Sequence, residues 1–181
     1  MKLTTTLVST ALVVSMIGLA NAADQEITDE EVIAAQQEWA DALIAIATAY
    51  DNEGAEKARE VAIAAIEDLY NYENEPVLFK PTLAQEPHRF RTTEEGAIAY
   101  FIGGNADFAG DSGFALKGWR AIDIDNAAIF TDGSVGISMG DVTLTDANGN
   151  TVSVDKTWAF QELENGDVVI VLHHSSLPYT E

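Results

Sequence analysis

The chain has 181 residues and carries 30 acidic against 9 basic side chains, which gives a formal net charge of -21 at neutral pH. A protein this acidic is repelled by phosphate backbones and by anionic lipid, so we expect neither a nucleic-acid partner nor binding to an acidic membrane surface. The absence of cysteine excludes disulfides, thiolate metal sites and a cysteine nucleophile.

The first 22 residues are typical of an export signal. Lys2 gives a short positive start, residues 7–19 are apolar, and Ala20-Asn21-Ala22 fits the small-x-small cleavage pattern. The apolar segment is too short for a stable membrane span. We therefore expect cleavage after Ala22, a single domain over residues 23–181, and a mature protein that is periplasmic or secreted and not attached to a membrane.

Two helices are predicted next. The first helix is predicted over residues 27–52, where Thr28 and Glu31 near its start fit a capping box. Residues 55–70 are alanine-rich and are predicted to form the second helix. Apolar residues recur at helical spacing, so the two helices should pair through these stripes. The stripe of the first helix is Val32, Ala35, Trp39, Leu43, Ile46 and Tyr50.

Short elements follow in the middle of the chain. Residues 77–80 read as a strand that Pro81 ends, and residues 89–91 read as a second extended piece. Thr92 and Glu95 fit another capping box, which predicts that a short helix begins at Thr92.

Period-two segments separated by turn residues predict long strands over residues 119–130, 135–145, 151–163 and from 168 onward. Gly118, Gly136 and Gly140 indicate bulges or bends in these strands. Helices followed by a curved antiparallel sheet define an α+β fold, with the first helix in the concave side of the sheet. Such a cone leaves a pocket at its open end.

The last strand changes from apolar residues 168–172 to His173-His174-Ser175-Ser176. Strand alternation places His173 and Ser175 on the face of Val169 and Val171, and directs His174 to the other face. Two of the chain's three histidines therefore diverge, which argues against a three-histidine zinc site. A metal held by one histidine and carboxylates stays open, as does a strand end that merely bonds to neighbouring backbone.

Several segments together resemble the iota-class carbonic anhydrases, whose fold is the NTF2-like cone of the calmodulin-dependent kinase association domain. The Lys-Pro-Thr and His-His-Ser-Ser-x-Pro pieces are the most specific of these segments. The segments are residues 39–43, 77–84, 90–93, 97–104, 113–116 and 172–179.

The resemblance implies reversible hydration of carbon dioxide to bicarbonate in a pocket of hydroxyl groups and an imidazole. By position it assigns catalytic roles to Thr82, Tyr100, His173 and Ser175, with bicarbonate held by the three hydroxyls. In this hypothesis His173 holds the hydroxyl network or carries the proton. Trp39, Phe101 or Trp158 would form an apolar wall suited to carbon dioxide. We expect no cofactor, although the family leaves a metal such as zinc or manganese open.

Two other classes of function compete with this interpretation. Cone folds also serve as non-catalytic binding or association modules. An isomerase or dehydratase would need an acidic base in the pocket, and the candidates, Asp41 and Asp155, are expected to face solvent. Pairing through the outer face of the sheet predicts a homodimer.

Overall fold

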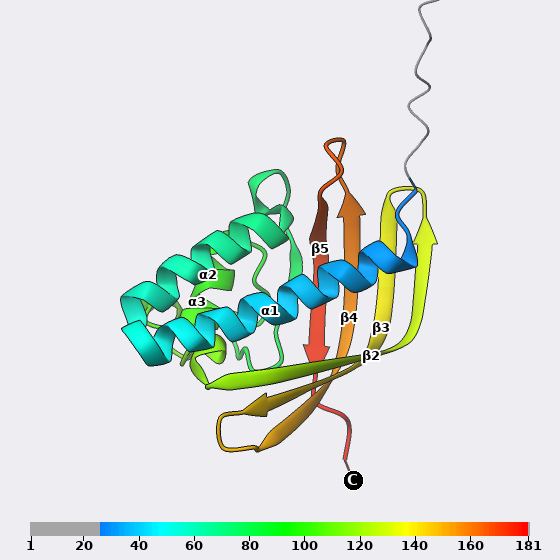
Figure 1. The fold of residues 1–181 in the computed structure, drawn as a ribbon. Helices are drawn as coiled ribbons and strands as arrows, with labels where there is room; N and C mark the ends of the chain where they lie inside the picture. Colours follow the sequence, from blue (N-terminus) through cyan, green and yellow to red (C-terminus); the bar gives the residue numbers. More distant parts are fainter. Residues whose placement is uncertain (1–25, 181) are drawn as a thin grey trace, which may run out of the picture.

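The computed structural model describes residues 26–180, so the predicted signal segment and its cleavage site lie outside the described residues. Helices α1 and α2 form a hairpin, α3 follows a short strand, and the long strands come last (Figure 1). No helix within the described residues combines the length and apolarity needed to cross a membrane. The element bounds are α1 Asp29–Glu53, α2 Ala55–Leu69, β1 Leu78–Lys80, α3 Glu94–Ile102, β2 Trp119–Asp132, β3 Val135–Asp146, β4 Thr151–Glu162 and β5 Val168–Ser176.

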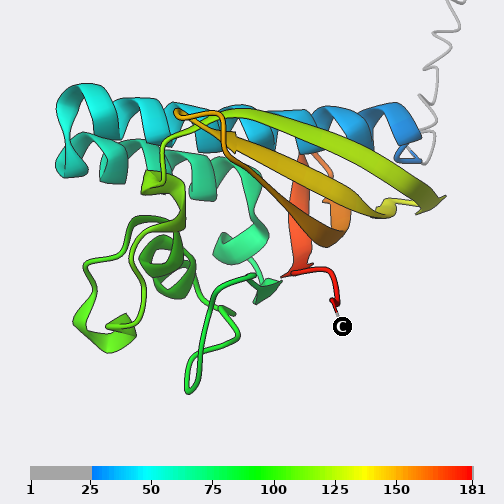
Figure 2. The ribbon, with the colours of Figure 1, turned by 90° about the horizontal axis from the view of Figure 1, so that it is seen from below.

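The strands form one sheet in the order β1-β5-β4-β3-β2. Helix α1 lies across the concave side of the bent sheet (Figures 1 and 2), which confirms the predicted α+β cone. The prediction of a purely antiparallel sheet is wrong at one edge, because β1 pairs with β5 in parallel and places Phe79 opposite His173. A parallel pair needs a crossover connection, and here all the elements between β1 and β5 provide it.

The start of α1 is fixed by its cap and by the sheet. The predicted capping box forms, with the Glu31 backbone N–H donating to the Thr28 hydroxyl and the Thr28 backbone N–H donating to the Glu31 carboxylate. The Ile27 N–H donates to the Gly133 carbonyl at 2.9 Å, which ties this end to the β2–β3 turn. Helix α1 therefore begins at Asp29, two residues later than predicted.

A buried polar network attaches the middle of α1 to the sheet. The Gln36 side chain donates to Asn126 of β2 at 2.9 Å and to Ser138 of β3 at 2.8 Å, and Asn126 donates back to Gln36 at 2.7 Å. Buried polar groups are costly unless paired, so this network favours one register of helix on sheet.

Glycines permit the close approaches in β3. A Cβ on Gly140 would lie 2.1 Å from the Asp125 carbonyl oxygen, at a register shift between Asn126 and Ala128, so the bulge predicted there is confirmed. Gly136 has a different role from the one predicted. A Cβ there would lie 2.4 Å from Val32, so this glycine admits α1 to the sheet.

Two local predictions in the middle of the chain need correction. Helix α3 begins at Glu94 with Thr93 as its cap, and Glu95 accepts a hydrogen bond from Asn105 instead of completing a box with Thr92. Residues 89–91 form no strand. One backbone bond, from Arg91 N–H to the Phe79 carbonyl at 2.8 Å, fixes this segment beside β1.

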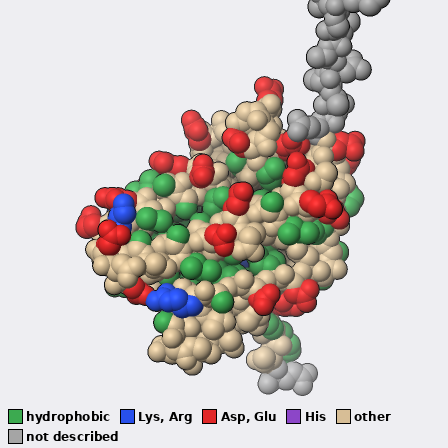
Figure 3. All heavy atoms as spheres, viewed as in Figure 1, with side chains coloured by type: hydrophobic (Ala, Val, Ile, Leu, Met, Phe, Trp, Pro, Cys, Tyr) green, Lys and Arg blue, Asp and Glu red, His purple; other side chains and the backbone are tan. Residues whose placement is uncertain are grey.

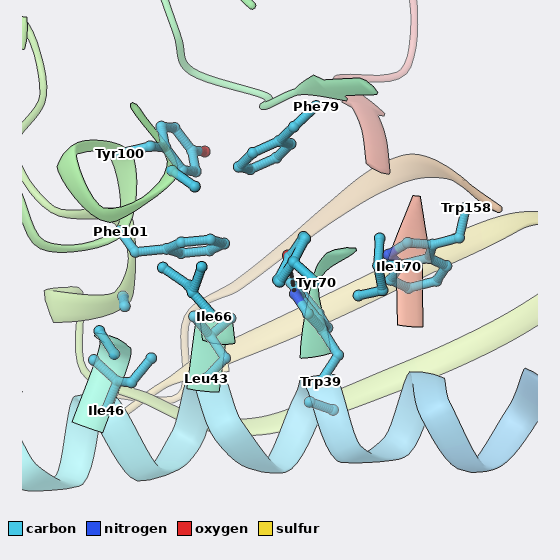
Figure 4. Close-up of a cluster of buried hydrophobic side chains, with 14 of the residues drawn as sticks. Trp39, Leu43, Ile46, Ile66, Tyr70, Phe79, Tyr100, Phe101, Trp158 and Ile170 are labelled. Atoms are coloured by element: carbon cyan, nitrogen blue, oxygen red, sulfur yellow. Dashed lines mark hydrogen bonds between the residues drawn. The ribbon is translucent and has the colours of Figure 1, made fainter. Parts of the chain in front are cut away.

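The apolar core lies between the helices and the concave face of the sheet. Trp39, Leu43 and Ile46 project from α1 toward side chains of α2, α3 and β5 (Figure 4). The buried face of α2 consists of Ala58, Ala62 and Ile66. The small alanines let α2 lie close to α1, and the aromatic side chains fill the space beyond.

Candidate functional site

The end of β5 presents His173 and Ser175 to the concave face of the sheet, as predicted. Both are 2 % exposed, whereas His174 faces solvent. The alternation does not continue unbroken toward the start of the strand. Phe160 pairs with Ile170 while Ala159 pairs with Leu172, so a bulge puts Ile170 on the side of His173. The predicted placement of Val169 and Val171 on that face is therefore wrong.

A small pocket lies in front of these two residues. The six side chains predicted for the site, from four separate segments of the chain, all line it. The lining residues are Trp39, Phe79, Pro81, Thr82, Tyr100, Phe101, Phe114, Leu144, Val154, Lys156, His173 and Ser175.

The hydroxyl groups of Thr82 and Ser175 are hydrogen-bonded at 2.5 Å between their oxygen atoms. Lys80 donates to the Ser175 carbonyl at 2.9 Å, which holds the end of β5 against β1. Burial raises the pKa of Tyr100 far above its usual range, and contacts with the Leu83 backbone and the Thr82 hydroxyl only partly oppose this shift. Tyr100 therefore remains a protonated hydrogen-bond donor at neutral pH.

His173 lies between two polar partners. Its Nδ1 is 2.8 Å from the Tyr70 hydroxyl, which also accepts from the Trp39 indole N–H at 3.0 Å. Its Nε2 is 2.7 Å from the Lys156 Nζ. The Phe79 ring stacks on the imidazole with 4.5 Å between centroids.

This environment keeps His173 neutral. Burial, followed by the adjacent Lys156 and then His174, holds the pKa of the His173 imidazole well below its usual range. Both ring nitrogens have partners within the protein.

The sequence interpretation missed Lys156 and Tyr70 as members of the site. Lys156 is 5 % exposed and lies in β4 between the inward-facing Val154 and Trp158. The signal was available, since a lysine at an inward position of an alternating strand is unusual. Tyr70 carried no such signal, because it immediately follows α2 and its contact with His173 depends on the tertiary fold.

Aromatic rings form the rest of the pocket. The Trp39 ring meets Trp158 edge-on at 5.6 Å between centroids, and Phe79 stacks on Phe101 at 5.7 Å. Figure 4 shows Phe79, Tyr100 and Phe101 facing one another across the interior. Trp158 packs against Trp39 and does not itself line the pocket.

No carboxylate lines this pocket. Asp41 and Asp155 are solvent-exposed, as expected, which leaves an isomerase or dehydratase without its acidic base. On the face in Figure 3, acidic side chains are scattered over the surface. Within residues 26–180 no cluster of three or more histidine or acidic side chains could hold a metal ion.

A wider surface groove adjoins the pocket. The groove shares Thr82, Phe114 and Val154 with the pocket. Lys117 and Leu177 also line the groove. The groove is lined by both a cationic and an acidic side chain, Lys117 and Asp146.

A helix in the concave side of a bent sheet, over an interior pocket, defines the NTF2-like class of folds. One solved NTF2-like protein, from Cytophaga hutchinsonii, shares this fold with a TM-score of 0.51 at 13 % identity, over 84 % of this chain and all of that one. Residues 30–177 match the family described as metal-independent carbonic anhydrase, and the chain belongs to that family.

Two relatives within the family are much more similar. A metal-independent carbonic anhydrase from Nostoc sp. is 49 % identical over 158 residues, which cover 87 % of this chain and 77 % of the relative. The crystal structure of a cyanobacterial iota-carbonic anhydrase complexed with bicarbonate has a TM-score of 0.85 and 50 % identity, over 86 % of this chain and 95 % of that one.

Proposed function

We propose that this protein catalyses the reversible hydration of carbon dioxide to bicarbonate in the pocket of Thr82, Tyr100 and Ser175, without a metal ion. The observation that carries the proposal is the meeting of three hydroxyl-bearing side chains, distant in the chain, in a buried pocket that no carboxylate lines. Such a pocket suits a small anion rich in hydrogen-bond acceptors. The bicarbonate complex of the 50 % identical cyanobacterial structure supports the same ligand here.

The geometry supports a separate role for each group in this proposal. Trp39 and Phe101 offer apolar contact to carbon dioxide, which is linear and uncharged. The hydroxyl groups orient the attacking water and donate to the oxygens on which negative charge develops, and preorganised donors of this kind lower the barrier most in a site that excludes water. His173 holds the arrangement in place, because its two nitrogens are fixed by Tyr70 and Lys156.

Hydration activity is expected to survive removal of metals. Zinc enzymes depend on the metal to lower the pKa of bound water, and the described part of this chain gathers no such ligand set. Stopped-flow measurement of carbon dioxide hydration, before and after dialysis against a strong chelator, checks this. Equal rates are expected. A rate that falls to the buffer background and returns with zinc or manganese would contradict the metal-free mechanism, and a protein inactive under every condition would favour a non-catalytic binding module.

We further propose that the protein is a homodimer that pairs through the outer face of the sheet. Phe130, Ile137 and Met139 are 61 %, 40 % and 60 % exposed, and register places Phe130 opposite Ile137 on β2 and β3. Exposed apolar clusters of this kind commonly mark protein interfaces.

Changing Met139 to Asp is expected to convert the dimer to a monomer, because a charge would be buried at the centre of the interface. Light scattering coupled to size-exclusion chromatography measures the mass. The matched control is Ile33→Asp, since Ile33 is 50 % exposed on α1 and should leave the dimer intact. A monomeric parent protein, or a Met139→Asp variant that still dimerises, would contradict this interface.

A further inference from the structure

Lys156 is a buried lysine without an acidic partner. Its side chain is 5 % exposed, and none of the ion pairs formed within residues 26–180 includes it. Burying an unpaired ammonium group is costly, so burial lowers the pKa of Lys156 to about 7. An amine in this position exchanges between its neutral and charged forms near neutral pH.

The position of Lys156 places that amine in the pocket. Register sets Lys156 of β4 directly opposite Ser175 of β5, and both side chains line the pocket with Thr82 and Tyr100. Among the described residues, the hydrogen-bond partner of its Nζ is His173 Nε2, at 2.7 Å.

Aromatic rings also surround the amine. The Nζ atom lies 4.3 Å from the centroid of the Trp39 ring and 5.0 Å from that of Trp158. Aromatic faces attract a cation that has lost its water. The site therefore accepts a neutral amine and also stabilises the ammonium ion when it forms.

We propose that Lys156 is the catalytic residue that accepts the proton lost by water as it attacks carbon dioxide. This rests on the proposed function. The water oxygen forms a bond to carbon, one water O–H bond breaks, and its proton passes to the lone pair of the Lys156 amine. Carbon dioxide, water and a neutral amine thus become bicarbonate and an ammonium ion, with mass and charge balanced. Release of the proton to solvent buffer restores the amine.

The same step provides the charge that bicarbonate needs. The anion appears in a pocket that no carboxylate lines, and the new ammonium ion is its counter-charge. A lysine that stayed charged throughout would instead bind bicarbonate more tightly and slow its release. A lysine that is neutral before the reaction and charged after it avoids this cost.

His173 acts here as a positioning residue. We assign His173 Nε2 as the acceptor of an amine N–H from Lys156. In this tautomer the ring N–H is on Nδ1 and donates to the Tyr70 hydroxyl. The other titratable groups that line the pocket or contact His173 are the phenols of Tyr100 and Tyr70. Burial raises the pKa of both phenols, so neither competes for the proton.

The test compares Lys156→Met with Lys57→Met, a substitution at an exposed lysine of α2. Steady-state hydration by stopped flow is measured from pH 6 to 9, with circular dichroism to verify folding. For the parent protein, kcat/KM should rise with pH through about 7 and then level off, because the neutral amine is the active form. Lys156→Met should lose about 100-fold in kcat, within the usual range for a general base, lose the dependence near pH 7, and recover part of its activity with added small amines. Lys57→Met should match the parent.

The outcomes separate this inference from the proposed function. If the parent hydrates carbon dioxide and Tyr100→Phe is impaired, while Lys156→Met keeps the parent rate and pH profile, Lys156 is not the proton acceptor. If the parent itself is inactive, the proposed function fails first.

A second measurement stands even if Lys156→Met does not fold. Nuclear magnetic resonance of labelled lysine in the parent protein follows the charge of the Lys156 amine. We expect a transition near pH 7 that moves to higher pH when bicarbonate is added. An amine that stays charged up to pH 9, with no response to bicarbonate, would overturn the proposal.

Discussion

Replacing Tyr100 with phenylalanine, or Ser175 with alanine, is expected to lower the rate of carbon dioxide hydration by about tenfold or more while leaving the fold intact. Each change removes one preorganised hydroxyl, and loss of a single donor of this kind commonly costs at least this much. Both side chains are buried in the pocket, and neither substitution enlarges the side chain. Stopped-flow kinetics measures the loss, and the unfolding midpoint in urea verifies the fold.

Matched controls lie close by in the sequence. Ser176→Ala removes a hydroxyl from the adjacent position, which points to the other face and donates to exposed Asp155 at 3.4 Å. Tyr72→Phe removes a phenol that donates to the Arg91 carbonyl, away from the pocket. Both controls should hydrate carbon dioxide at the parent rate. Unchanged kinetics in Tyr100→Phe and Ser175→Ala together would refute the assignment of the site.

Changing Asp111 to alanine is expected to lower the free energy of unfolding by about 3–5 kcal/mol, the usual cost of leaving a buried charge without its partner. The two guanidinium nitrogens of Arg91 each lie 2.8 Å from a different Asp111 oxygen, and the side chains are 3 % and 7 % exposed. The Arg91 guanidinium also lies 4.5 Å from the centroid of the Phe108 ring. The pair thus joins the segment before α3 to the loop after it.

Two comparisons test whether burial causes that loss. Glu60→Ala breaks the exposed pair with Lys57 and should cost less than about 1 kcal/mol, as surface pairs do. The double change Arg91→Met with Asp111→Leu removes both charges and should be more stable than Asp111→Ala alone. Urea unfolding provides all three values. A loss below about 1 kcal/mol in Asp111→Ala would show that the pair is not structurally important.

The sequence predicted most of the fold because its local signals agree with its packing. Thr28 and Glu31 form the capping box that their spacing predicts, and the period-two segments became β2 to β5 with small changes at their ends. The parallel pairing of β1 with β5 was not predictable in this way. It depends on where a three-residue strand returns after the helices, and no local pattern encodes that position.

The resemblance to a family predicted which hydroxyl-bearing residues line the pocket. It did not predict the buried charged and polar contacts around them. Thr82, Tyr100 and Ser175 meet as expected. The buried contact between Lys156 and His173 joins two strands at a register that alternation alone cannot determine. The bulge at Val171 shows why, since one extra residue changes which apolar side chains share the face of His173.

The most direct test of the metal-free hydroxyl pocket is a crystal structure of the metal-stripped protein soaked in bicarbonate. We predict a planar anion within hydrogen-bond distance of Thr82, Tyr100 and Ser175. One edge of the anion should face Lys156, and no metal density should lie beside it. An anion bound elsewhere with this pocket empty, or a metal ion between the anion and the protein, would contradict the account.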